Sequence, residues 1–249
     1  IQFEVDANGY VVEHRYDDYG HESMLIRYEE KLTTDELSVL QAGRGLERQL
    51  NREVDRITLK FYDLDGYLIA EQDPAGYVTT FTLDAAGRQT AKQHYLQPLA
   101  FSPGSHAELI NAISSLDFLT SYYFYNGKNE CELEVDQLGY ITTHTYFADG
   151  KVATSARYAD PVTADWLKTP EKRPEVLLGN KAQVTSYHYD ELRRKTAIHY
   201  PNGKVEAWTY DNADHVTSHT SYDAREPACS DGDHFRQELY QYRGFGDLI

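Results

Sequence analysis

Gln72–Tyr95 reads QDPAGYVTTFTLDAAGRQTAKQHY, and Val5–Tyr28, Val135–Tyr158 and Tyr200–Tyr222 can be laid over it. The first glycines of the four stretches are Gly9, Gly76, Gly139 and Gly203, so the steps are 76−9 = 67, 139−76 = 63 and 203−139 = 64 residues. A supersecondary unit repeated at so regular a period is typical of a solenoid, propeller or spiral. The repeat predicts one continuous array over residues 1–249, with units of about 1–56, 57–118, 119–181 and 182–249.

Each unit alternates apolar and polar residues on both sides of a glycine turn, which predicts an antiparallel β-hairpin. Glycine suits such turns because it tolerates a positive φ, and Asn or Asp tolerates it next best. One apolar column follows the first turn of each unit, at Val11, Val78, Ile141 and Val205. The predicted turns are Asn8-Gly9, Asp65-Gly66, Ala75-Gly76, Ala86-Gly87, Asn126-Gly127, Leu138-Gly139, Asp149-Gly150 and Asn202-Gly203.

Segments between the hairpins break this alternation and favour short helices. Thr33 is followed by Glu36 in a capping-box pattern that ends at Gly43, and Ser105 with Glu108 repeats the pattern. A shorter version runs from Thr163 to Leu167, and the weakest spans Ala224–Phe235. The fold class is therefore mainly β, with tandem hairpins forming a curved or spiral sheet and helical inserts that lie on it as lids.

The composition narrows the possible partners. The chain of 249 residues has 24 Lys+Arg against 40 Asp+Glu, a formal charge of −16, which repels nucleic acid and anionic membranes. No apolar run approaches the roughly 18 to 20 residues of a membrane helix, so membrane insertion is not expected. The sequence starts within an expected strand and shows no signal peptide, which favours a fragment of a larger protein.

Several turns share a further pattern, Tyr-Asp followed after two residues by Gly. Examples are Phe61-Tyr62-Asp63-Leu64-Asp65-Gly66, Tyr16-Asp17-Asp18-Tyr19-Gly20 and Leu83-Asp84-Ala85-Ala86-Gly87-Arg88, and Tyr189–Arg194 matches with the glycine replaced. This pattern resembles the Tyr-Asp motif of the RHS/YD-repeat family over about two thirds of the chain. The helical inserts are not part of the simple family repeat.

The resemblance implies a function as well as a fold. In RHS/YD proteins the hairpins wind into a hollow shell around a toxic C-terminal segment in bacterial toxins, and teneurins use a related shell outside cells. It implies a non-catalytic segment of a shell or scaffold in a large secreted or surface bacterial protein. The implied partners are neighbouring repeats of the parent protein and an encapsulated toxin domain. Asp73-Pro74-Ala75-Gly76 is similar to a fragment of the family's self-cleavage motif, but it lies mid-array as an ordinary turn.

The residues themselves do not indicate an enzyme, a metal site or a cofactor. HExxH, Gly-x-Ser-x-Gly and P-loop motifs are missing from the sequence. Asp63-x-Asp65-Gly66 and Asp231-Gly232-Asp233 are similar to calcium loops but have no Glu at the expected downstream place. Cys131 and Cys229 have unlike neighbours and favour two free thiols over a disulfide. His188 and His199 are expected to face each other across a hairpin.

A binding module is the alternative function. Tyr10, Tyr77 and Tyr140 share one column, where the fourth unit has Lys204, and their rings are expected to stack on cross-strand neighbours. The functional alternative is an exposed aromatic ladder for sugar rings. In that case the protein would be an adhesin-like module for host glycans or host proteins, with Trp166 and Trp208 as further binding residues.

Overall fold

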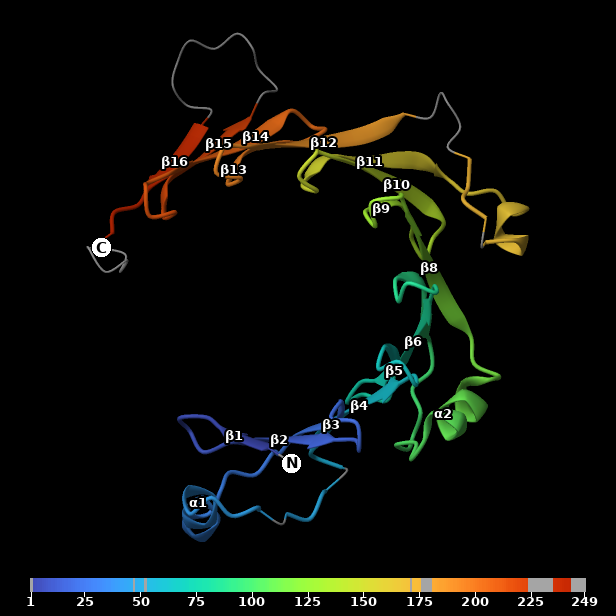
Figure 1. The fold of residues 1–249 in the computed structure, drawn as a ribbon, viewed down its shortest axis with the longest axis vertical. Helices are drawn as coiled ribbons and strands as arrows, with labels where there is room; N and C mark the ends of the chain where they lie inside the picture. The colour runs from blue at the N-terminus through green and yellow to red at the C-terminus, as the bar shows by residue number, and fades with distance from the viewer. Residues whose placement is uncertain are drawn as a thin grey trace. The chain divides into compact units, whose positions relative to one another are not determined.

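The computed structural model describes residues 2–46, 48–51, 53–170, 172–175, 181–223 and 235–242. The chain divides into two compact units, Ile1–Tyr122 and Tyr123–Ile249, each of which is described by itself. Across the described residues the strands follow one another in chain order, and each pairs with its chain neighbours in antiparallel orientation. The predicted class, mainly β with hairpins in tandem, is confirmed (Figure 1).

The first unit contains seven complete strands, two helices and the beginning of β8. Its elements are β1 (Gln2–Val5), β2 (Val11–Tyr16), β3 (Glu22–Arg27), α1 (Thr34–Gln41), β4 (Arg56–Tyr62), β5 (Leu68–Gln72), β6 (Val78–Leu83), β7 (Gln89–Tyr95), α2 (His106–Ile113) and β8 (Phe118–Tyr125). The second unit continues with β9 (Cys131–Val135), β10 (Tyr140–Tyr146), β11 (Val152–Pro161), the 3₁₀ helix η1 (Trp166–Lys168), β12 (Ala182–Tyr189), β13 (Lys195–His199), β14 (Lys204–Tyr210), β15 (Val216–Asp223) and β16 (Phe235–Leu239).

Seven of the eight predicted turn glycines have a positive φ, between 75° and 91°. The exception is Gly127. In its turn Asn129 has a φ of 66°, because the turn runs from Asn126 to Asn129 and its fourth residue must be left-handed. The predicted position of this turn is therefore confirmed, but the prediction that Gly127 has the positive φ is wrong.

A register shift occurs where each Tyr-Asp strand meets its turn, immediately before Tyr16, Tyr62, Leu83, Tyr146, Tyr189 and Tyr210. The returning strand supplies one extra residue at each shift, as a β-bulge does. The extra residue carries a hydroxyl in four cases, and three of these hydroxyls bond across the strand pair. Ser23 donates to the carbonyl of Arg15, and Thr90 donates to that of Thr82. The Thr217 hydroxyl bonds to that of Thr209 at 2.9 Å.

The inserts form as the capping patterns predict in two of the four cases. Thr33 caps α1 in a full capping box with Glu36, and Ser105 caps α2 by accepting from the Glu108 N–H. The third segment is only the 3₁₀ turn η1. Residues 224–234 of the fourth lie outside the described residues, and Phe235 begins β16. Helices α1 and α2, at eight residues each, are too short to cross a bilayer, and no other described helix is long and apolar enough.

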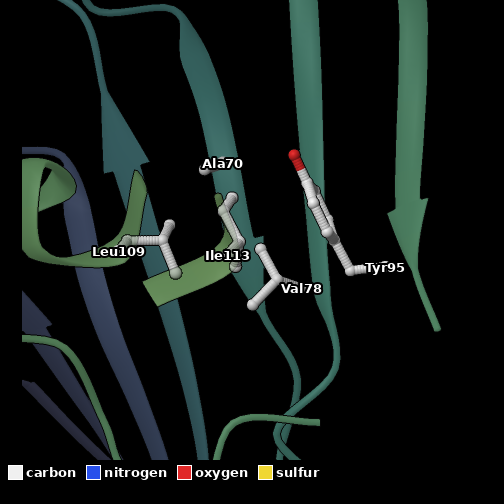
Figure 2. Close-up of a cluster of buried hydrophobic side chains, with 5 residues drawn as sticks. All are labelled: Ala70, Val78, Tyr95, Leu109 and Ile113. Carbon is white, nitrogen blue, oxygen red and sulfur yellow. The ribbon is translucent and has the colours of Figure 1, made fainter. Parts of the chain in front are cut away.

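Helix α2 covers one face of the sheet, which we name the covered face. Leu109 and Ile113 of α2 pack on Ala70, Val78 and Tyr95, and all five side chains are buried (Figure 2). A second cluster joins Val11, Ile26 and Tyr28, with Leu32 and Leu50 of the first insert packed against it. Val11, Val78 and Ile141 of the predicted apolar column are buried, and Val205 is half-buried.

Candidate functional site

The Tyr-Asp turns share one hydrogen-bond pattern. In the turn of Asp17, the carboxylate oxygen Oδ1 accepts from the N–H groups of Tyr19 and His21, both at 2.9 Å. The carbonyl of Asp17 accepts from the N–H of Gly20 at 3.1 Å. Asp63, Asp84 and Asp211 do the same in their turns. The Asp of the motif is therefore a turn-forming residue whose side chain satisfies two backbone donors.

In five of the described turns, the residue directly after the turn reaches forward to the next hairpin along the chain. In the first unit the ring of His21 stacks on Tyr62, with ring centroids 4.8 Å apart and planes 25° apart. The ring of Tyr67 lies against Gly87 so closely that a Cβ at residue 87 would overlap it. We call this series of contacts the YD row.

The YD row recurs in the second unit with different side chains. Lys151 Nζ lies 4.7 Å from the centroid of Tyr189, and Arg194 Cζ lies 4.8 Å from that of Tyr210. His215 stacks on Tyr242 at 4.5 Å. Cations over aromatic faces and stacked rings each contribute about 0.5–1.5 kcal/mol. At these turns a side chain joins the hairpin to the following one, in addition to the strand ladder.

The tyrosine hydroxyls of the row tie the turn back to the preceding strand. Tyr62 donates to the carbonyl of Glu22 at 3.1 Å, Tyr146 to that of Cys131 at 2.5 Å, and Tyr210 to that of Lys195 at 2.7 Å. Burial raises the pKa of all three phenols above the usual value. The phenols consequently stay protonated at neutral pH and keep these hydrogen bonds.

Three inserts are anchored at the first glycine of a repeated stretch, Gly9, Gly76 or Gly139. The N–H of Leu32 donates to the carbonyl of Gly9, that of Leu99 to Gly76, and that of Val162 to Gly139, at 2.8–2.9 Å. The spacing is constant, since 32−9, 99−76 and 162−139 all equal 23. At Gly76 an added Cβ would lie 2.5 Å from the carbonyl oxygen of Leu99. Glycine is required there both for its φ of +91° and for this close approach.

A charged cluster fastens the first insert to the covered face. The Arg48 guanidinium lies 4.8 Å from the Tyr28 ring centroid and forms a 3.1 Å ion pair with Glu36 of α1. Tyr28 donates its hydroxyl to the buried carboxylate of Glu13, which also accepts from Arg15. Burial, followed by the Glu13 charge, raises the pKa of Tyr28 to about 12.

A second charged cluster crosses β2, β3 and β4. Glu22 accepts from Lys60 Nζ at 2.5 Å and contacts His14 Nδ1 at 2.5 Å. The hydrogen bond from Lys60 is the largest cause that lowers the pKa of Glu22, and the one from His14 follows. The carboxylate therefore holds three strands together while it is ionised.

The three predicted tyrosines each lie beside one polar neighbour. Lys31 Nζ lies 4.9 Å from the centroid of Tyr10, His94 stacks on Tyr77 at 6.0 Å, and Arg157 lies 5.3 Å from Tyr140. Tyr10 and Tyr77 precede β2 and β6, which are four strands apart, or about 19 Å at the usual strand spacing. These two rings are separate features, and the structure does not bring them together.

The two tryptophans occupy different surroundings. Trp208 is half-buried, and His219 on the paired strand stacks on it at 5.1 Å with planes 11° apart. Trp166 donates its indole N–H to the carbonyl of Lys172 at 2.7 Å. It lines a cavity of about 370 Å³ together with Ile141, Tyr158, Pro161, Lys172 and Arg173.

Other chemistry-bearing residues form no shared site. His188 and His199 face each other with ring centroids 4.8 Å apart, as expected. Burial raises the pKa of the Cys131 thiol to about 11, so it is a weak nucleophile at neutral pH. Within the described ranges no group of three or more His, Cys, Asp and Glu side chains could hold a metal ion. Asp63 bonds within its own turn, while Cys229 and Asp231–Asp233 lie outside the described residues.

The turn pattern of β4 to β7 decides the family of this segment. Residues 62–95 match the family model described as RHS Repeat. This chain carries an RHS repeat. No curated protein sequence matches the chain. The matched RHS segment contains two turns of the YD row, those of Asp63 and Asp84, and the Tyr67–Gly87 contact between them.

The likeness to solved structures covers nearly the whole chain. Over 99% of its length the chain is similar to part of the Photorhabdus luminescens Tc holotoxin pore, at 15% identity and a TM-score of 0.54, and it spans 10% of that chain. The crystal structure of TcdB2-TccC3 matches at 14% identity and a TM-score of 0.47, over 99% of this chain and 14% of that one. The first likeness shows the fold alone.

The forward-reaching residues of the YD row were missed from the sequence. His21, Tyr67, Lys151 and Arg194 share no residue type, so they form no column of similar letters. Their common feature is position, directly after the fourth residue of a Tyr-Asp turn. The constant step of 23 residues from the turn glycine to the insert residue that bonds to it could have identified the insert anchor from the sequence.

Proposed function

We propose that this chain is a non-catalytic wall segment of a shell or scaffold in a large secreted or cell-surface bacterial protein. The shell encloses a toxic C-terminal region of the same protein, and its partners are the neighbouring RHS repeats and that enclosed domain. The observation that supports this most is the YD row, in which five described turns each contact the next hairpin along the chain. Such nearest-neighbour contacts suit a surface that grows by repetition.

The outer strands support the same proposal. Within the described residues β1 pairs with β2 alone and β16 pairs with β15 alone. A strand paired on one side presents a row of unpaired N–H and C=O groups that can pair with a further strand. In a wall these edges continue into adjacent repeats.

Self-association of the isolated chain tests the proposal. We expect sedimentation velocity to show a weight-average sedimentation coefficient that rises between about 5 and 200 µM, because open edges of separate copies pair. A chain that remains strictly monomeric over this range would contradict the wall function.

Glycan binding is a second candidate, supported by the cavity beside Trp166. An aromatic face in a cavity with cationic and apolar walls suits a sugar ring. Trp166→Ala should then abolish binding on a glycan array while the far-ultraviolet circular dichroism is retained. Trp208→Ala is the matched control, since His219 already covers that indole. An array without signal for the wild-type chain contradicts this candidate.

A further inference from the structure

The aromatic ring at the first turn of the YD row is exposed. Tyr16 holds the same place in the first unit as Leu83 and Tyr210 hold in the second and fourth repeats. Tyr67 reaches the turn after Leu83, and Arg194 covers Tyr210. Tyr16 remains 42% exposed, and in the described part of the first unit no cation or ring lies over it. Its hydroxyl makes only a long, 3.4 Å hydrogen bond to Gln2.

The contact of Arg194 with Tyr210 shows which interactions Tyr16 lacks. Arg194 lies over Tyr210, and its Nη1 donates to the carbonyl of Asp211 at 2.8 Å and to the carboxylate of Asp214 at 2.9 Å. The corresponding carbonyl at the first turn belongs to Asp17, next to Tyr16 in the chain. Tyr16 thus presents the ring face and the adjacent carbonyl that an arginine uses at Tyr210.

We propose that Tyr16 and the carbonyl of Asp17 receive a basic side chain from another RHS hairpin that pairs with the open edge of β1. The inference rests on the proposed wall function and names the contact by which the next hairpin is selected. Four of the five forward-reaching residues at covered turns are basic, namely His21, Lys151, Arg194 and His215. Asp17 and Asp18 beside Tyr16 provide the complementary negative charge.

The alignment of the repeats predicts which sequence position supplies the basic side chain to Tyr16. Gly203 and Gly9 are 203−9 = 194 residues apart, so Lys195 corresponds to Ile1 and Arg194 to the position immediately before Ile1. Strand β12 and its turn lead into Arg194, and β12 pairs with β13 as the incoming strand would pair with β1. A copy of residues 181–194 is therefore the matched partner segment.

The test grafts residues 181–194 directly ahead of Ile1 in the otherwise complete chain. Nitration of Tyr16 by tetranitromethane, followed by peptide mass spectrometry, reports whether its ring is covered. We expect the graft to slow Tyr16 nitration at least about fivefold. A graft with Arg194→Ser in the grafted copy should restore most of the rate. Tyr19, at 82% exposure in the same turn, is the internal reference and should react equally in all three proteins.

Hydrogen exchange at the β1 amides distinguishes failure of the Tyr16 contact from failure of the proposed wall function. Slowed exchange at Phe3 and Val5, whose N–H groups face away from β2, with unequal Tyr16 nitration in the two grafts supports the inference. Slowed exchange with equal nitration in the two grafts overturns the Tyr16 contact and leaves the wall function intact. Unchanged exchange means that a matched RHS hairpin does not add to β1, which overturns both.

Discussion

The N–H of Leu99 donates a 2.9 Å hydrogen bond to the carbonyl of Gly76, which joins the second insert to the turn that opens its repeat. The same pairing recurs at Gly9 with Leu32 and at Gly139 with Val162. Each insert therefore starts from a fixed point on its own hairpin. The helix that follows is positioned by this bond before its apolar side chains pack.

Gly76→Ala should be strongly destabilising. The φ of +91° disfavours any side chain, and the new Cβ would lie 2.5 Å from the Leu99 carbonyl oxygen. We expect a loss of about 2–3 kcal/mol in the free energy of unfolding, measured in urea. Gly127→Ala is the control and should change stability by less than about 0.5 kcal/mol, because nothing lies within 4 Å of its added Cβ. Equal effects of the two substitutions would contradict the anchor.

Leu109→Ala should loosen helix α2 from the sheet. Leu109 is fully buried against Ala70 and Val78, so its truncation leaves a cavity and is expected to cost about 2–4 kcal/mol. Ile110→Ala, on the neighbouring residue with 42% exposure, should cost less than about 1 kcal/mol. Thermal unfolding of both variants checks the contrast, and similar melting temperatures would show that α2 does not cover the sheet.

Glu22→Gln should weaken the chain at neutral pH and lose its effect in acid. The hydrogen bonds from Lys60 and His14 lower the pKa of Glu22 in the folded state. A lowered folded pKa contributes stability that is fully present above the unfolded pKa and disappears as pH falls through the folded pKa. We expect a deficit of about 1 kcal/mol at pH 7 that shrinks below about pH 4. A deficit that stays constant from pH 7 to pH 3 would argue against the ionised carboxylate as the cause.

Arg193→Gly should stabilise the chain. Arg193 has a φ of 66° at the position where the turns of Asp17, Asp63 and Asp84 have glycine. Relief of this conformation is worth about 1 kcal/mol, and the exposed 3.5 Å ion pair with Asp149 offsets only part of it. Leu192→Gly, one residue earlier and without a positive φ, is expected to destabilise by about 0.5–1 kcal/mol. Chemical unfolding of the two variants should therefore shift in opposite directions.

Local chemistry explains which elements the sequence could predict. The capping residues Thr33 and Ser105 identified α1 and α2 because a side chain that satisfies helix donors is a short-range signal. In the turn that contains Gly127, the sequence prediction placed the positive φ at that glycine. The residue with the positive φ is Asn129, because Asn also tolerates this conformation. The segment at Thr163 has a similar opening but forms only η1, which Pro170 follows closely.

The candidate site was less predictable than the fold. The predicted binding column consists of one residue type, at Tyr10, Tyr77 and Tyr140. Each of these rings has a different neighbour, namely Lys31, His94 or Arg157. The YD row depends on which side chain follows a turn and on which ring the next hairpin brings beneath it. That pairing joins residues that are far apart in the chain, from 210−194 = 16 positions for Arg194 and Tyr210 to 62−21 = 41 for His21 and Tyr62, and no local pattern encodes it.

The forward contacts in the described part of the chain go from one turn to the next hairpin, as His21 touches Tyr62 and Arg194 touches Tyr210. A gene that gains or loses one whole repeat therefore breaks a single junction and recreates an equivalent one. The height of the proposed wall is then a quantity that tandem duplication can adjust without any compensating mutation elsewhere. The same locality confines the harm of a poor junction to two hairpins.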